Sequence, residues 1–426
     1  MDKNIEVRSS LSASKLWPLQ KQYYKKKGPK AWESEVPYSI TNSAFIAQKY
    51  VQIIIDFIHT HWKTHPKQTN FQILELGSGV GKLAYLCMLA LDEWKSSLPI
   101  KINLQYFMSD CTKDTLDYWR SHPDLQPFFE KSIAHALQVE FDYKQAISFK
   151  NEMGEWKPSA PLIVIANYFF DSIYHDAFIV KEKELYAQLI TISNKDKVPD
   201  INNMQSLRFK FTSDKINASD YYQDKNLNDL LMHYQHKAPN NFPFLIPLGA
   251  IDIVNYLSNI DQPVLILSSD KGYNEIETMD YTKTFNIVLN GSLATCVNYH
   301  AISWYVNKLG GTSITPRVPL NHGRLLTCVF TLNNSTPYAN NLTHQIQRHL
   351  NNSTLADYYL WISSVNNLAH ATLSEIITIL RTGHYDTKVF SNLYPLLIST
   401  LGKRKPEHML ILNECLQKIH SQIYFH

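Results

Sequence analysis

The middle of the chain alternates short apolar runs with helical segments, a pattern typical of a parallel sheet covered by helices on both faces. The runs have strand length and are rich in β-branched and aromatic residues. They are Phe71–Leu76, Ile100–Met108, Ala134–Phe141, Pro161–Ala166 and Pro263–Ser269. A helix over Val297–Leu309 then precedes Thr312–Val318 and Leu325–Leu332, which predict an antiparallel hairpin.

Two regions depart from this alternation. Between the fourth and fifth strands the sequence predicts a hairpin over Phe178–Ser193, a strand over Leu207–Phe211 and a polar helix over Asp220–His236. A crossover needs far fewer residues. This insertion, about residues 175–250, is therefore predicted to cap the substrate site, the alternative being a loop-rich excursion. From residue 343 onward, amphipathic helices predict an all-α unit that either binds a protein partner or braces the rest.

The patterns divide the chain into an N-terminal helical arm (residues 1–60), a central α/β domain (61–335) and a C-terminal helical unit (340–426). In the arm, Ser43 and its neighbours offer caps for a helix over Ala44–His59. Residues 11–35 mix aromatic residues with lysines, as some nucleic-acid-binding segments do. A net charge of only +3 favours instead an arm whose aromatic residues pack on the central domain.

Composition narrows the class of protein. With 44% hydrophobic and 19% charged residues among 426, the chain is expected to fold as a globular protein. Its five cysteines are scattered and form no CxxC pair, which predicts reduced thiols, a cytoplasmic location and no metal site. The longest apolar run near the start is too short to span a bilayer, so no membrane is expected as a partner. The small net charge also makes a nucleic acid an unexpected partner.

The strongest chemical signal is a glycine cluster at the end of the first apolar run. Three of the 13 glycines, Gly77, Gly79 and Gly81, fall within five residues. They precede an apolar helix over Leu83–Leu91. Glycine lets a backbone turn tightly and lets a ligand approach closely. A P-loop is excluded by its spacing, because a serine or threonine would have to follow Lys82. A dinucleotide fingerprint would place the third glycine one residue later.

Glu75-Leu-Gly77-x-Gly79-x-Gly81 resembles motif I of class I S-adenosylmethionine-dependent methyltransferases. The resemblance implies a Rossmann-like, seven-stranded mixed sheet that ends in an antiparallel hairpin. Nicotinamide-binding Rossmann domains lack this hairpin. It also implies S-adenosylmethionine as the cofactor, with the loop against its methionine and ribose and the preceding acid at its amino acid portion. The loop residues concerned are Glu75, Gly77, Ser78, Gly79 and Gly81.

Two further acids follow predicted strands. Asp110 comes after the second strand, where a carboxylate can accept hydrogen bonds from both hydroxyls of a ribose. Asp142 comes after the third strand. Ligands of parallel sheets bind beyond the carboxyl ends of the strands, so both residues are predicted to contact the cofactor.

Three blocks together resemble the MidA-type methyltransferases, which include a mitochondrial complex I assembly factor that methylates a protein arginine. The blocks are Val36-Pro37-Tyr38 with Ile40-Thr41, Glu75–Lys82 and Ala166–Asp171. The resemblance adds Thr41 to the cofactor-binding residues. Tyr168 stands where the family usually has a glutamate, and an acid is the natural partner of a guanidinium. The acceptor is therefore left open between arginine and another group.

These features predict an enzyme that transfers a methyl group, most simply to a protein side chain. Asn167, Tyr168 and Asp171 follow the fourth strand, where class I enzymes face the acceptor, and are the predicted catalytic residues. Asp171 could alternatively cap a helix, and His175 is a second candidate base. Three other functions stay open: a catalytically silent cofactor-binding scaffold that acts through its C-terminal helices, a nucleotide-binding oxidoreductase and an RNA methyltransferase.

Overall fold

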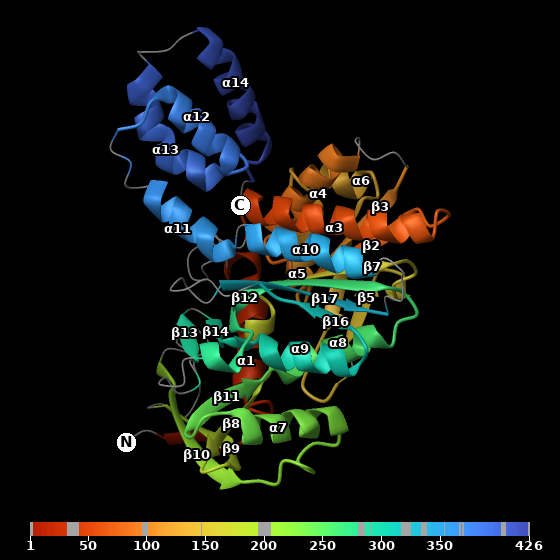
Figure 1. Ribbon diagram of the computed structural model, residues 1–426, viewed down its shortest axis with the longest axis vertical. Coiled ribbons are helices and arrows are strands. Elements are labelled where there is room, and N and C mark those ends of the chain that lie inside the picture. Colours follow the sequence, from red (N-terminus) through yellow and green to blue (C-terminus); the bar gives the residue numbers. More distant parts are fainter. Residues whose placement is uncertain are drawn as a thin grey trace.

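A large sheet runs through the middle of the molecule, with helices on both of its faces and a smaller sheet below it (Figure 1). The structure is a computed structural model, and it describes most of the chain. The described residues are 3–31, 42–95, 101–145, 147–194, 206–279, 285, 287–290, 292–316, 325–333, 339–352, 354–365, 368, 370–401 and 406–424.

The five apolar runs form adjacent parallel strands at the centre of the large sheet, as predicted. Their order is β4, β3, β2, β7, β12. The bounds are β2 (Asn70–Leu76), β3 (Asn103–Asp110), β4 (Ala134–Glu140), β7 (Leu162–Asn167) and β12 (Val264–Tyr273). Beyond β12, β17 (Leu325–Leu332) runs antiparallel to both β12 and β16 (Thr312–Ile314), which confirms the antiparallel pairing. The connection over residues 317–324 lies outside the described residues.

The large sheet has ten described strands, so the prediction of seven was too small. A short hairpin of β5 (Ser148–Asn151) and β6 (Gly154–Glu155) extends the edge next to β4. The two residues of β15 (Val297–Asn298) also pair with β12. Segments this short carry too little alternation to predict a strand from the sequence.

The two faces of the sheet carry separate hydrophobic cores, because successive side chains of a strand point to opposite faces. Ile73 belongs to the core beneath α3 (Ala44–Thr64) and α4 (Lys82–Lys95). Leu74 and Leu76 belong to the core beneath α8 (Leu248–Ser258) and α9 (Tyr299–Lys308). Two short helices, α5 (Lys113–Ser121) and α6 (Gln126–Glu130), connect β3 to β4.

The insertion builds a second, five-stranded sheet at the bottom of Figure 1. Its predicted hairpin, strand and helix are confirmed, and all pairs of this sheet are antiparallel. The elements are β8 (Asp176–Lys181), β9 (Glu184–Asn194), β10 (Arg208–Lys215), α7 (Lys225–Lys237) and β11 (Phe242–Ile246). Its fifth strand is β1 (Lys3–Ser9), so the N-terminal arm is not entirely helical. A helix, α1 (Leu16–Lys27), and a turn, η1 (Gly28–Lys30), follow β1. A separate short ribbon pairs β13 (Val288–Asn290) with β14 (Ser292–Ala294).

The described residues of the C-terminal region form five helices, which confirms the predicted helical character. They are α10 (Ala339–Asn352), α11 (Leu355–Val365), α12 (Leu373–Thr382), α13 (Thr387–Thr400) and α14 (Pro406–Ser421). Their apolar side chains, such as Leu380 and Ile419, belong to the same core cluster as Ile54 of α3 and Leu86 of α4. The helical unit and the sheet therefore share one continuous core. Among the described residues, no helix is both long and apolar enough to cross a membrane. All five cysteines are free thiols.

Asp386 ties the helical unit to α3 and should contribute more stability than an ordinary helix cap. Its buried carboxylate accepts hydrogen bonds from the backbone N–H groups of Lys388, Val389 and, across the interface, Ala44 at 2.9 Å. Asp386→Ala should lower the free energy of unfolding by about 3 kcal/mol, because buried donors lose their acceptor. Thr372→Ala, which removes the exposed cap of α12, should cost about 1 kcal/mol. If urea denaturation gave equal losses of unfolding free energy for the two variants, Asp386 would not connect the helical unit to α3 as described.

Candidate functional site

A cavity of about 430 Å³ lies at the carboxyl ends of β2, β3, β4 and β7. Its lining includes Gly77, Asp110, Asp142 and Tyr168, one residue from the segment at or just beyond each of these strands. The four residues are far apart in the sequence. They meet because the carboxyl ends of parallel strands share one edge of the sheet, where ligands of such folds bind. The cavity is therefore the candidate cofactor site.

The glycine loop takes the backbone conformation that its composition predicts. Gly77, Gly79 and Gly81 have φ values of 66°, 53° and 84°, in the left-handed region that favours glycine. A Cβ atom on Gly77 would lie 2.8 Å from Cδ2 of Phe169, and one on Gly81 would lie 2.8 Å from Cε of Met108. Gly77 lines the cavity, whereas Ser78, Gly79 and Gly81 shape the turn behind it.

Glu75 lies on the opposite face of the sheet from the cavity. Its side chain is buried, and its Oε2 accepts a hydrogen bond of 3.0 Å from the hydroxyl of Tyr106. Burial raises the pKa of Glu75 to about 7. Since Glu75 alternates with Leu74 and Leu76, its side chain points toward α3 and α4. The carboxylate thus supports the strand beneath the loop and does not line the cavity.

The two acids that follow β3 and β4 both line the cavity. Asp110 accepts a hydrogen bond of 3.1 Å from the backbone N–H of Thr112, and burial raises its pKa to about 6. Asp142 forms an ion pair with Lys21, with 2.7 Å between Oδ2 and Nζ. Among the described residues, Asp142 thus has a cationic partner across the cavity, whereas Asp110 forms no ion pair.

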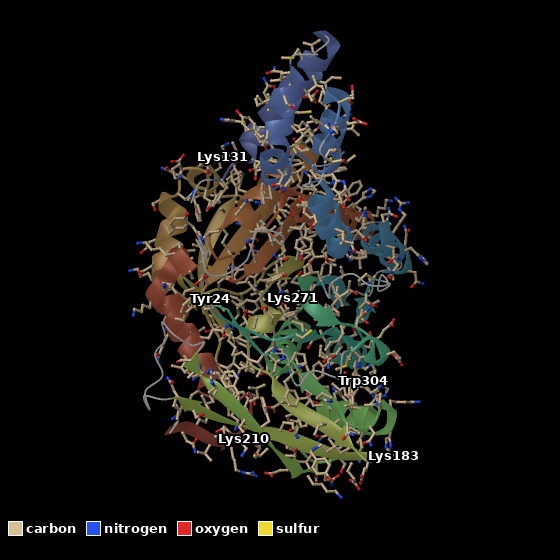
Figure 2. The ribbon with its side chains drawn as sticks, turned by 90° about the vertical axis from the view of Figure 1, so that its left-hand side faces the viewer. Tyr24, Lys131, Lys183, Lys210, Lys271 and Trp304 are labelled. Atoms are coloured by element: carbon tan, nitrogen blue, oxygen red, sulfur yellow. The ribbon has the colours of Figure 1, made fainter. Side chains whose placement is uncertain are left out.

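The wall opposite the sheet comes from α1, which sequence reasoning did not assign to the site. Trp17, Gln20, Lys21 and Tyr24 line the cavity. Gln20 also donates a hydrogen bond of 3.1 Å to the carbonyl of Ser172. Figure 2 shows Tyr24 on α1, between the large sheet and the insertion sheet. The mixture of aromatic residues and lysines in this segment was the available signal, but nothing in the sequence placed it at the carboxyl ends of the strands.

The turn after β7 separates the predicted catalytic residues. Tyr168 has a φ of 50°, an uncommon conformation for a residue with a Cβ, and it lines the cavity. Its backbone N–H donates to the carbonyl of Ser269 at 2.9 Å. Burial raises the pKa of Tyr168, so the hydroxyl keeps its proton at neutral pH. Asn167 turns the other way and accepts a hydrogen bond of 3.1 Å from the hydroxyl of Tyr50.

Asp171 is buried directly behind the cavity wall. It lies in the single turn η2 (Phe170–Ser172), so the alternative role as a helix cap does not apply. Its Oδ1 accepts a hydrogen bond of 2.6 Å from the hydroxyl of Ser172, a cavity-lining residue. Asp270 accepts from the backbone N–H of Asp171 at 3.0 Å. Burial raises the pKa of Asp171 to about 6, and burial and the Asp171 charge raise the pKa of Asp270 further.

His175 is fully buried and does not line the cavity. Its Nε2 lies 2.8 Å from the hydroxyl of Thr295, and burial lowers its pKa to about 4. A histidine with this pKa is neutral at physiological pH. Thr41, the remaining predicted cofactor residue, lies outside the described residues.

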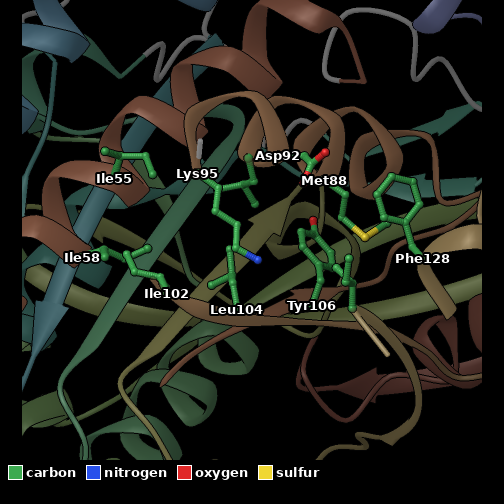
Figure 3. Close-up of a pocket in the computed structure, with 11 residues that line it drawn as sticks. Ile55, Ile58, Met88, Asp92, Lys95, Ile102, Leu104, Tyr106 and Phe128 are labelled. Atoms are coloured by element: carbon green, nitrogen blue, oxygen red, sulfur yellow. The ribbon is translucent and has the colours of Figure 1, made fainter. Parts of the chain in front are cut away.

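A second, smaller cavity lies away from the carboxyl ends of the strands (Figure 3). It has a volume of about 40 Å³ between α3, α4 and β3, and its lining is mostly apolar, including Ile55, Met88 and Phe128. Of these two cavities, the larger one brings together a glycine, two acids and a turn with positive φ. In the part of the chain that the structure describes, no group of three or more His, Cys, Asp or Glu side chains could hold a metal ion.

Residues 54–322 match the family described as "Putative S-adenosyl-L-methionine-dependent methyltransferase". The chain belongs to this methyltransferase family. Membership confirms S-adenosylmethionine as the cofactor and a methyltransferase as the class of enzyme. The matched region contains the glycine loop, both acids and the turn after β7. It excludes α1 and the C-terminal helical unit.

Two crystal structures from Burkholderia thailandensis, both of the COG1565 superfamily, are also similar to this chain. One was determined with S-adenosylhomocysteine bound. It is 12% identical with a TM-score of 0.44, and the match covers 66% of this chain and 66% of that protein. The other is 12% identical with a TM-score of 0.44, and its match covers 70% of this chain and 72% of that protein. The family match over residues 54–322 confirms the predicted resemblance to S-adenosylmethionine-dependent methyltransferases. No curated protein matches the chain.

Filling the space at the glycine loop should abolish cofactor binding. Gly77→Ala places a Cβ against Phe169 and forces a left-handed backbone on alanine. Affinity for S-adenosylmethionine should fall at least tenfold, measured by calorimetric titration. Gly310→Ala is the matched control, because Gly310 also has a positive φ of 78° but a Cβ there would meet nothing within 4 Å. Equal affinities in the two variants would contradict the role of the loop.

The buried Glu75 should make the protein less stable as the pH rises. Its pKa of about 7 in the folded state lies above the ordinary value, so its contribution is full at low pH and is lost as the pH rises through 7. Glu75→Gln should gain roughly 2 kcal/mol of unfolding free energy over the native protein between pH 5 and pH 8. Urea denaturation at both pH values measures this gain.

Glu375 provides a control of opposite sign. This exposed residue of α12 accepts hydrogen bonds from the backbone and hydroxyl of Thr372, which lower its pKa. Its stabilising contribution is therefore present above its unfolded pKa and is lost as the pH falls. Glu375→Gln should lose stability relative to the native protein as the pH rises. Parallel pH curves for the native protein and Glu75→Gln would contradict a buried, protonated Glu75.

Proposed function

We propose that the protein transfers the methyl group of S-adenosylmethionine to a protein side chain in the cavity at the carboxyl ends of the strands. The observation that supports this most directly is the convergence of Gly77, Asp110, Asp142 and Tyr168 on one cavity. Gly77 would allow close approach of the cofactor, and Asp110 would accept from its ribose hydroxyls. Asp142 lies farther along the same edge and would contact the base once it separates from Lys21.

The bound cofactor would supply an activated methyl group and its own leaving group, so the protein mainly positions the acceptor and manages one proton. Tyr168 faces the cavity with a protonated hydroxyl and would orient the acceptor by hydrogen bonding. Asn167 bonds to Tyr50 and Asp171 lies behind the wall, so both would act on the acceptor indirectly. Asn167 would fix the end of β7 from which Tyr168 projects.

Ser172 connects Asp171 to the cavity and would serve as a proton relay. As the acceptor gains its methyl group, its proton would pass to Ser172 Oγ while the serine proton moves to Oδ1 of Asp171. This requires Asp171 to be ionised, and its pKa of about 6 makes it so at neutral pH. One carboxylate would thus receive the proton without touching the acceptor.

We also propose that the chain consists of the three parts described above, residues 1–60, 61–335 and 340–426. The insertion over residues 175–250 would cap the acceptor side of the cavity. The helical unit over residues 340–426 would hold the cofactor domain and could bind a protein partner. A cytoplasmic location remains part of the same proposal. Position 168 of the cavity lining holds a tyrosine where the MidA-type family usually has a glutamate. This favours an acceptor other than an arginine, because a guanidinium is best held by a carboxylate.

The proposal predicts a pH-dependent transfer rate. The native protein should transfer radiolabelled methyl groups from S-adenosylmethionine to total protein of source cells that lack the gene. The rate should rise with pH through about 6 and then level off, because Asp171 must be ionised. Asp171→Asn should remove this rise and lower the rate about 100-fold. Ser172→Ala should lower the rate with little change in cofactor affinity.

Asp56→Asn is the control, because Asp56 of α3 pairs with His349 of α10, away from the cavity. It should leave the pH profile unchanged. Binding of S-adenosylmethionine without transfer to any protein would instead support the silent scaffold. Binding of NAD in place of S-adenosylmethionine would overturn the proposed function.

A further inference from the structure

The glycine loop is held from below by two aromatic side chains. The indole N–H of Trp119, on α5, donates to the carbonyl of Gly79 at 2.8 Å. The hydroxyl of Tyr424 donates to the carbonyl of the next residue, Val80, at 2.5 Å. Trp119 belongs to the α/β domain. Tyr424 follows α14, at the far end of the helical unit, more than 300 residues from the loop.

Tyr424 fits closely into the space beneath the loop. It is buried, and its ring stacks on His122 with centroids 4.3 Å apart and planes 5° apart. A Cβ atom on Gly81 would lie 3.2 Å from its hydroxyl. Tyr85 of α4 secures the same end of the chain, since its hydroxyl donates to the carbonyl of Ser421 at 2.7 Å. The last turn of the helical unit therefore lies directly against the cofactor loop.

We propose that Tyr424 is a positioning residue for the cofactor loop, and that the affinity for S-adenosylmethionine depends on the docked helical unit. This inference rests on the cofactor site assigned above. The family match ends at residue 322, so the contact comes from a part of the chain outside the matched region.

The physical reason lies in the composition of the loop. Three glycines in five residues give the free loop many backbone conformations, and binding a ligand to one of them costs entropy. Fixing the carbonyls of Gly79 and Val80 restricts the loop before the cofactor arrives, which strengthens binding by preorganisation. By linkage, the cofactor must stabilise the docked end of α14 by the same factor that docking strengthens the cofactor.

Tyr424→Phe and Tyr85→Phe form a matched pair of variants. Each removes one hydroxyl from the same junction, but of these two hydroxyl groups only that of Tyr424 bonds to the loop. Tyr424→Phe keeps the ring against His122 and should weaken S-adenosylmethionine binding about fivefold in calorimetric titration. Its KM for the cofactor should rise by the same factor, while kcat stays within about twofold. Tyr85→Phe should change cofactor affinity less than twofold.

Amide hydrogen exchange provides a second readout that a purely structural role would not move. S-adenosylmethionine should slow exchange in residues 406–424 of the native protein and of Tyr85→Phe, and this protection should be reduced in Tyr424→Phe. Equal cofactor affinities in Tyr424→Phe and Tyr85→Phe, with the native protein binding normally, would overturn this inference alone. Failure of the native protein to bind S-adenosylmethionine would overturn the cofactor site and this inference together.

Discussion

The structure depends on one constraint, the parallel alignment of five buried strands. Because β4, β3, β2, β7 and β12 run in the same direction, the segments that follow them emerge at one edge of the sheet. That edge brings Gly77, Asp110, Asp142 and Tyr168 to one cavity. An antiparallel arrangement would send alternate turns to opposite ends and leave these side chains apart. The apolar strands therefore determine both the core and the site.

Local features of this arrangement could be predicted from the sequence, because they depend on neighbouring residues. The glycines at 77, 79 and 81 indicated a turn, and the structure places all three at positive φ. The apolar runs indicated the strands, and the antiparallel pairing of β16 with β17 followed from their order. The position of α1 at the cavity and the contact of Tyr424 with the loop could not be predicted. Each joins segments more than 100 residues apart, and such packing leaves no periodic signal.

The carboxylates show a second limit of sequence reasoning. The sequence identifies acids at the ends of strands but not the face to which each side chain points. Glu75 lies two residues before Gly77, the first glycine of the loop. Side chains alternate along β2, however, and the side chain of Glu75 points away from the cavity. Asp171 follows β7 in a tight turn that buries it behind Ser172. In both cases burial raises the pKa, and neither carboxylate lines the cavity.

The shared core bears on the two roles proposed for the helical unit, a brace and a partner-binding module. Leu380, Leu393 and Ile419 pack in the same cluster as the side chains of α3 and α4, so separating the unit would expose a large apolar surface to water. A detachable binding module would instead have its own core and a polar joint. The shared core therefore supports the proposal that the unit acts as a brace. A brace that ends against the cofactor loop also gives any partner on the outer helices a direct physical route to the site, since moving α14 moves Tyr424.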